Sequence, residues 1–120
     1  MGYESKVIIA RKFHEKQDSC LDIVAELELS GMDGGFLDLF DKEWKTGYYD
    51  MTAEKTIVKD KYDKVVTYAP FNKVYKWCLD NANGTDGHRY RRLDVLIGVL
   101  NAIRLGWYDY KDFVIIHYGY

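Results

Sequence analysis

The densest group of side chains that could bind an anion lies in the second half of the chain, where basic residues surround one aromatic residue. This basic cluster comprises His88, Arg89, Tyr90, Arg91 and Arg92. It stands at the start of a predicted helix, where the positive end of the helix dipole disfavours cations. Helix starts also offer free N–H groups, and arginine binds phosphate or carboxylate through paired hydrogen bonds. We therefore expect the cluster to bind an anion or an acidic partner. The alternative is that its arginines pair with acids of the chain such as Asp86 and Asp94.

Aromatic residues form a second group of candidate contact residues, since they make up 16% of the chain. Those near predicted turns or near the last residue are Tyr48, Tyr49, Trp107, Tyr108, Tyr110 and Tyr120. Tyrosine and tryptophan supply a large, stiff contact area with a polar tip, and interfaces are enriched in them. A surface with tyrosines beside arginines suits protein recognition or the stacking of nucleobases.

Motifs of the common hydrolases, zinc enzymes and nucleotide sites are missing from the sequence. It contains no GxSxG, HExxH, GxGxxG or GxxxxGK[ST] pattern, and each of these marks a defined chemistry. His117 alternates with Phe113 and Ile115 in a predicted strand, so we expect it to point inward as a core histidine. An enzyme with a site around His117 is kept as an alternative, and neither a cofactor nor a metal is expected.

Thiols and loop acids are expected to be structural rather than functional. Cys20 and Cys78 are far apart and form no CxxC pattern, so buried free thiols are the expected state. Four acids follow the second predicted strand, and we expect them to be solvated: Asp33, Asp38, Asp41 and Glu43.

Hydrophobic patterns predict the elements that must position these residues. A period of two over 21–30 predicts a strand with one apolar and one largely acidic face, which forms a hairpin with a strand over 6–12. Further strands are predicted over 48–49, 56–58, 65–68 and 113–118, with a helical turn or irregular lid over 36–40. Apolar residues at helical spacing predict helices over 70–82, with Pro70 in the first turn, and over 93–103. This order predicts an α+β fold: an antiparallel or mixed four- to five-stranded sheet with two helices packed on one face.

Length and composition predict one domain over residues 1–120. A chain of 120 residues with 48% apolar and 30% charged residues can bury its own core. The net charge of −2 makes a general nucleic-acid or membrane binder unexpected. No apolar run is long enough for a membrane helix, and the first residues lack a signal peptide, so we expect a cytoplasmic protein without a membrane partner.

The whole chain resembles the small uncharacterised proteins carried by bacteriophages and prophages. The features that carry the resemblance are the opening Met1-Gly2-Tyr3-Glu4-Ser5-Lys6-Val7, the Tyr68-Ala69-Pro70 step into a helix, the Arg91-Arg92 helix start and the ending Val114-Ile115-Ile116-His117-Tyr118-Gly119. None of them is a functional motif, so no catalytic residue is implied. The resemblance implies a bacterial cytoplasmic setting and a protein that binds and inhibits a host factor.

These observations favour a non-enzymatic binding protein, such as a phage-encoded inhibitor of a host or defence protein that acts by protein–protein contact. The main alternative is a nucleotide- or RNA-binding module that uses the basic cluster. Self-association into a homodimer is a further expectation, because exposed aromatic residues and the edge of the first hairpin can pair across a two-fold axis.

Overall fold

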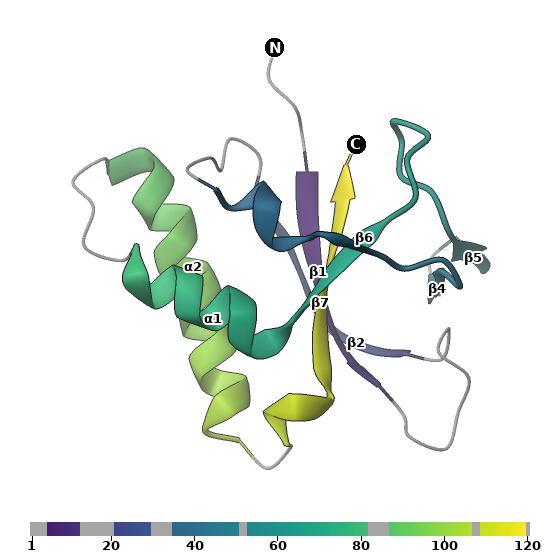
Figure 1. The fold of residues 1–120 in the computed structure, drawn as a ribbon. Helices are drawn as coiled ribbons and strands as arrows, with labels where there is room; N and C mark the ends of the chain where they lie inside the picture. The colour runs from purple at the N-terminus through teal and green to yellow at the C-terminus, as the bar shows by residue number, and fades with distance from the viewer. Residues whose placement is uncertain are drawn as a thin grey trace.

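The computed structural model describes residues 5–12, 21–29, 35–50, 53–81, 87–106 and 109–119, with the backbone alone for 87–91. Its strands are β1 (Ser5–Lys12), β2 (Leu21–Glu28), β3 (Lys42–Glu43), β4 (Tyr48–Asp50), β5 (Lys55–Ile57), β6 (Thr67–Pro70) and β7 (Phe113–Gly119). Its α-helices are α1 (Phe71–Asp80) and α2 (Gly87–Arg104), and its short 3-10 helices are η1 (Leu37–Leu39) and η2 (Tyr110–Asp112). Figure 1 shows this arrangement.

The main sheet has five strands in the order β2-β1-β7-β6-β3, and every neighbouring pair is antiparallel. A second, two-stranded sheet joins β4 to β5. The continuous apolar run of 113–118 lies at the centre of the main sheet, and Phe113 to His117 are buried. A central strand is covered on both faces, which explains why its sequence does not alternate. The predicted α+β fold with an antiparallel sheet is confirmed.

The β1–β2 hairpin contains a bulge at Val24, where three consecutive residues of β2 are apolar. Ile9 pairs with Ala25, but the next residue of β1, Ala10, pairs with Ile23. Val24 is therefore the extra residue of the bulge, and 44% of its surface is exposed. A bulge of one residue shifts the following side chains to the opposite face of the sheet.

This shift corrects the expectation of a single apolar face over 21–29. Ala25 and Leu27 pack against the buried cluster that contains the helices. Leu21 and Ile23 pack against the second buried cluster, on the other side of the sheet. The apolar residues of β2 therefore serve both cores.

Both α-helices belong to the same buried cluster as alternate residues of β1 and β7. Its members from these four elements are Val7, Ile9, Phe71, Val74, Tyr75, Cys78, Leu93, Leu96, Leu100, Phe113 and Ile115. Two details of the helix prediction were wrong. Leu79 is 45% exposed, because it follows Cys78 by one residue and turns about 100° away from the buried stripe. Pro70 is the N-cap of α1, with extended backbone, rather than a residue of its first turn.

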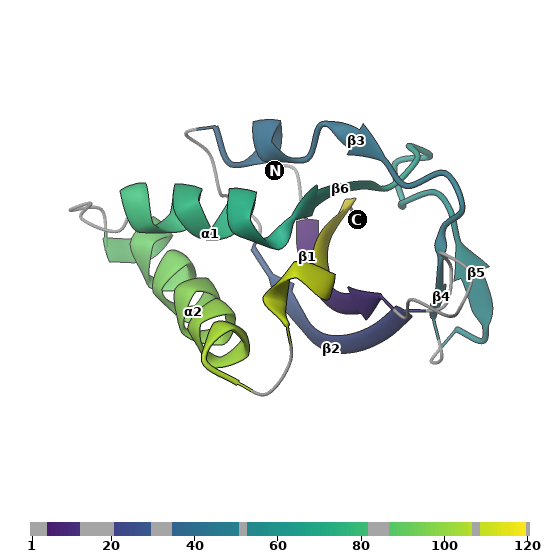
Figure 2. The same ribbon diagram turned by 60° about the horizontal axis from the view of Figure 1, so that its bottom comes forward.

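The second cluster lies on the opposite face of the sheet, beneath the β4–β5 hairpin. Its buried members are Ile8, Trp44, Tyr48, Val66, Val114 and Ile116. In Figure 2 the helices lie at the left, the β4–β5 hairpin lies at the right, and the strands of the main sheet run between them. The strands predicted over 48–49 and 56–58 pair with each other, whereas the one predicted over 65–68 leads into β6 of the main sheet. No helix in the described part of the chain is long and apolar enough to cross a membrane.

Candidate functional site

A cleft opens between the β4–β5 hairpin and the main sheet, and we name it the hairpin cleft. Its volume is about 310 Å³. It is lined by Lys6, Tyr48, Asp50, Ile57, Lys61 and Tyr118. These residues come from β1, β4, β5, the loop that follows β5, and β7. The cleft therefore exists only because the hairpin folds back over the sheet.

Two phenol side chains in the cleft are held in their neutral form. Burial raises the pKa of Tyr48 far above its ordinary value, and the carboxylates of Asp50 and Glu26 add to the rise. Burial also raises the pKa of Tyr118, with further contributions from the carboxylates of Asp60 and Asp50. Both hydroxyl groups are uncharged at neutral pH, so they can donate hydrogen bonds to an acceptor in the cleft.

The two lysines of the cleft differ in their surroundings. The ammonium group of Lys6 lies 3.6 Å from the carboxylate of Glu26 and 5.2 Å from the centroid of the Tyr118 ring. Lys61 is exposed, and among the described residues no carboxylate forms an ion pair with its ammonium group. Its backbone N–H donates to the carbonyl of Gly119 at 2.9 Å, which fixes Lys61 beside the end of β7. The mouth of the cleft therefore offers one available cation.

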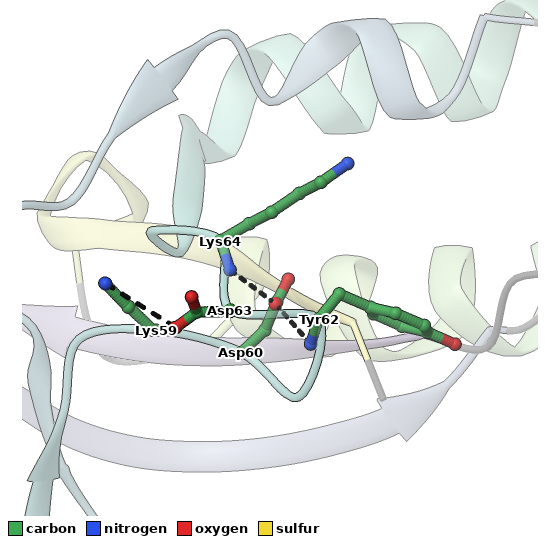
Figure 3. Close-up of polar contacts among 5 residues, drawn as sticks. All are labelled: Lys59, Asp60, Tyr62, Asp63 and Lys64. Atoms are coloured by element: carbon green, nitrogen blue, oxygen red, sulfur yellow. Dashed lines mark hydrogen bonds and ion pairs between the residues drawn. The ribbon is translucent and has the colours of Figure 1, made fainter.

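The turn that carries Lys61 is organised by the carboxylate of Asp60, as Figure 3 shows. One oxygen, Oδ1, accepts from the backbone N–H groups of Tyr62 at 2.8 Å and Lys64 at 3.1 Å. The other oxygen, Oδ2, accepts from the N–H of Gly119 at 3.3 Å. Asp63 adopts a left-handed φ of 62° in this turn, and its carboxylate lies 3.5 Å from the ammonium of Lys59. Asp60 is therefore a positioning residue that joins one wall of the cleft to β7.

The opposite wall depends on a tight turn that starts at Trp44. The indole Nε1 of Trp44 donates to the carbonyl of Gly47 at 2.6 Å, and the N–H of Gly47 donates back to the carbonyl of Trp44 at 3.2 Å. Gly47 has a φ of +71°, and a Cβ there would lie 2.5 Å from the carbonyl oxygen of Ile57. Only glycine fits this conformation and this close approach without strain. Gly47 thus sets how closely β4 approaches β5.

The predicted basic cluster lies at the start of α2, as expected. The helix begins at Gly87, so His88, Arg89, Tyr90 and Arg91 are within it, but their side chains lie outside the described part of the structure. Arg92 is half-buried, with its Nη1 atom shielded from solvent. Among the described residues no ion pair joins Arg92 to Asp94, which is exposed. The first turn of α2 contains no acidic residue to offset the cations.

The aromatic contact candidates differ in their exposure. Tyr49 is 46% exposed and remains available for contact. Tyr48 is only 1% exposed, so the expectation of an exposed pair at 48–49 was wrong for that residue: adjacent residues of a strand point to opposite faces. Tyr110 is half-buried, with its ring 5.6 Å from that of Phe71. Trp107, Tyr108 and Tyr120 lie outside the described residues.

His117 and Cys78 are titratable core residues that do not line the hairpin cleft. His117 is 8% exposed and its ring centroid lies 5.3 Å from that of Phe40, as expected of a core histidine. Burial lowers its pKa, while the carboxylate of Asp60 opposes the change. Cys78 is a buried free thiol whose pKa is raised to about 12 by burial, and Cys20 lies outside the described residues.

The acids that were expected to be solvated are exposed wherever the structure describes them. Asp38, Asp41 and Glu43 are exposed, and Asp33 lies outside the described residues. The carboxylate of Asp41 forms a surface ion pair with Lys73 at 3.2 Å. Within the described part of the chain, no three histidine, cysteine or acidic side chains gather to hold a metal ion.

The residues of the hairpin cleft are scattered along the sequence and come together only in the fold. Lys6, Asp50, Ile57 and Lys61 belong to no local motif, and Tyr118 is separated from all of them along the chain. Comparison with known proteins assigns the chain to no family. No family model, no curated protein and no solved structure matches it.

Proposed function

We propose that this protein is a non-enzymatic binding protein that contacts another protein through the β4–β5 hairpin and the hairpin cleft beneath it. The observation that carries the proposal is the cleft itself, with its two neutral phenols, two lysines and one carboxylate around a volume of about 310 Å³. That volume is at the lower end of the range of roughly 300–1,000 Å³ for ligand sites. It suits a few inserted side chains of a partner better than a large cofactor.

The protonation states of the described side chains support binding over catalysis. The phenols of Tyr48 and Tyr118 have raised pKa values, so neither supplies a phenolate base at neutral pH. Burial raises the pKa of Cys78 to about 12, which keeps the thiol protonated and poorly nucleophilic. His117 lines neither the hairpin cleft nor the smaller depression of about 170 Å³ beside Trp44. Neither of these two cavities therefore supports the alternative of an enzyme around His117.

Three exposed residues with large apolar surfaces are close in sequence to residues that line the cleft, and they favour a protein as the partner. Tyr49, Val58 and Tyr62 are 46%, 36% and 42% exposed, and they lie on β4, just after β5 and in the turn of Asp60. Interfaces are enriched in tyrosine, and their central residues bury apolar area while keeping a polar tip. The resemblance to phage accessory proteins supports the finer proposal that the partner is a host or defence protein inhibited in the bacterial cytoplasm.

Affinity capture from bacterial lysates tests this proposal. We expect the wild-type protein to retain one partner in stoichiometric amount. We expect Lys61→Glu to lose it, because the reversed charge repels an acceptor group that the cleft would bind. Lys76→Glu is the matched control, since Lys76 is an exposed lysine of α1. Absence of a stoichiometric partner from several hosts, or equal loss by both variants, contradicts the proposal.

A nucleotide- or RNA-binding module remains the second candidate, because the first turn of α2 combines a basic sequence with no acid. Anions are stabilised at helix N-termini by free N–H groups and the helix dipole. Binding through phosphates would weaken steeply as salt concentration rises.

A further inference from the structure

The outer edge of β2 is the longest unpaired strand edge among the described strands. β2 lies at one end of the five-stranded sheet, and β1 is its only described neighbour. The edge at the other end belongs to β3, which has two residues against the eight of β2. An unpaired edge presents backbone N–H and C=O groups that can pair with another extended chain. Figure 2 shows β2 as the outermost strand on its side of the sheet.

The side chains of this edge are acidic on the face that carries the second cluster. Glu26 and Glu28 pair with Ile8 and Lys6 of β1, so both carboxylates lie on that face, two residues apart. Both residues are exposed. The ammonium of Lys6 neutralises Glu26 at 3.6 Å, and no ion pair involves Glu28 among the described residues. A net negative charge therefore faces the open edge.

The bulge exposes one apolar side chain, that of Val24, beside the acidic residues of β2. Val24 is 44% exposed at the point where β2 bends, although it lies in the middle of a strand. Charged side chains, proline and bulges protect edge strands from pairing, and β2 has three acids and one bulge but neither lysine nor proline. An incoming strand would thus meet an exposed valine next to acidic positions.

We propose that the outer edge of β2 binds an extended, basic segment of a partner protein as an additional strand. Side chains directly opposite each other in an antiparallel pair attract when they carry opposite charges. Lysine or arginine at every second position of the segment would face Glu26 and Glu28, and apolar residues between them would face the side of Ala25 and Leu27. The edge lies next to the hairpin cleft but consists of different residues.

Charge complementarity selects this occupant over a second copy of the chain. β2 contains no lysine or arginine, so a second β2 offers no cation opposite any acid. In a two-fold antiparallel pair centred on Leu27, Glu26 would face Glu28 of the other copy. In a pair centred on Val24, Asp22 would face Glu26 of the other copy. Like charges directly opposite each other destabilise the pair.

Titration of a fluorescent peptide tests the proposal. The probe is Lys-Val-Arg-Val-Lys-Val-amide labelled with fluorescein at its N-terminus, and its anisotropy is measured with the full-length protein. We expect saturable binding that weakens at least tenfold with Glu28→Lys. Asp80→Lys is the matched control, because Asp80 is an exposed acid at the end of α1, and it should leave the affinity unchanged.

A second peptide separates strand pairing from simple charge attraction. N-methylation of alternate backbone amides removes their donors but keeps every side-chain charge, so we expect this peptide to bind at least tenfold more weakly. Equal binding of the methylated peptide, equal effects of both charge variants, or no binding of the first peptide would overturn the proposal. A dimeric mass in light scattering that Glu28→Lys changes would assign the edge to a second copy instead, and would also overturn it.

Discussion

Replacement of Gly47 by alanine should destabilise the protein strongly, because this glycine sets the approach of β4 to β5. Its φ of +71° places the residue in the left-handed region. An alanine there costs about 1–2 kcal/mol from contact between Cβ and its own backbone. The new Cβ would also lie 2.5 Å from the carbonyl oxygen of Ile57 and 2.9 Å from Cγ2 of Val58.

The total cost follows from adding the strain of overpacking to that of the backbone. Inserting a methyl group into a filled space costs about 1–3 kcal/mol, so Gly47→Ala should lower the free energy of unfolding by about 2–5 kcal/mol. The free energy of unfolding of native proteins is only about 5–15 kcal/mol. The substitution therefore removes a large share of the stability, and it should widen the hairpin cleft as β4 moves from β5.

Gly98→Ala is the matched control, since the same change is made in a different setting. Gly98 lies within α2, and a Cβ there would meet no atom within 4 Å. Alanine has a higher helix propensity than glycine, so Gly98→Ala should raise the free energy of unfolding by about 0.5–1 kcal/mol. Urea unfolding followed by tryptophan fluorescence measures both variants. A change of less than about 0.5 kcal/mol in the free energy of unfolding of Gly47→Ala, or a shift of both variants in the same direction, would contradict this account of Gly47.

Three further predictions concern the core thiol, the core histidine and the basic cluster. Cys78 should resist a thiol reagent in the native Cys20→Ser variant and react upon unfolding, since burial raises its pKa to about 12; fast labelling of the native variant would contradict this. The folded pKa of His117 is below its ordinary value of 6.5, so the unfolded chain binds the proton more readily and the free energy of unfolding should fall as pH drops below about 6.5. His117→Leu should reduce that slope in urea unfolding between pH 5.5 and 8, and an unchanged slope would exclude His117 as its source. The double variant Arg91→Gln and Arg92→Gln should keep the fold and abolish any salt-sensitive binding of a fluorescent RNA, if the second candidate function is correct. Full affinity in that variant would exclude these arginines from the site.

Most of the fold could be predicted from local patterns in the sequence. The apolar run of 113–118 indicated a strand buried on both faces, and β7 is the central strand. Helical spacing selected Leu93, Leu96 and Leu100, all of which are fully buried. Such patterns work because each face of an element has one environment, which the side chains must match.

The bulge and the hairpin cleft could not be predicted, because both depend on contacts between distant residues. Val24 interrupts the alternation of β2, since Ile23, Val24 and Ala25 are all apolar, but an apolar residue on the outer face does not by itself show that pairing with β1 shifts there. Tyr48 and Tyr49 are chemically identical and adjacent, so the sequence cannot tell which of them is buried. Tyr48 is buried because its side of β4 faces the main sheet. The cleft also needs the turn of Asp60 to bring Lys61 beside Gly119.

The most direct test of the proposed binding face compares substitutions at two large side chains of similar relative exposure. Tyr49 on β4 is 46% exposed, and Leu79 on α1 is 45% exposed. Calorimetric titration of the purified partner should show Tyr49→Ser weakening its affinity at least tenfold, a loss of about 1.4 kcal/mol, with Leu79→Ser equal to wild type. Wild-type affinity of Tyr49→Ser, or a comparable loss in Leu79→Ser, would contradict the assignment of the binding face to the β4–β5 hairpin.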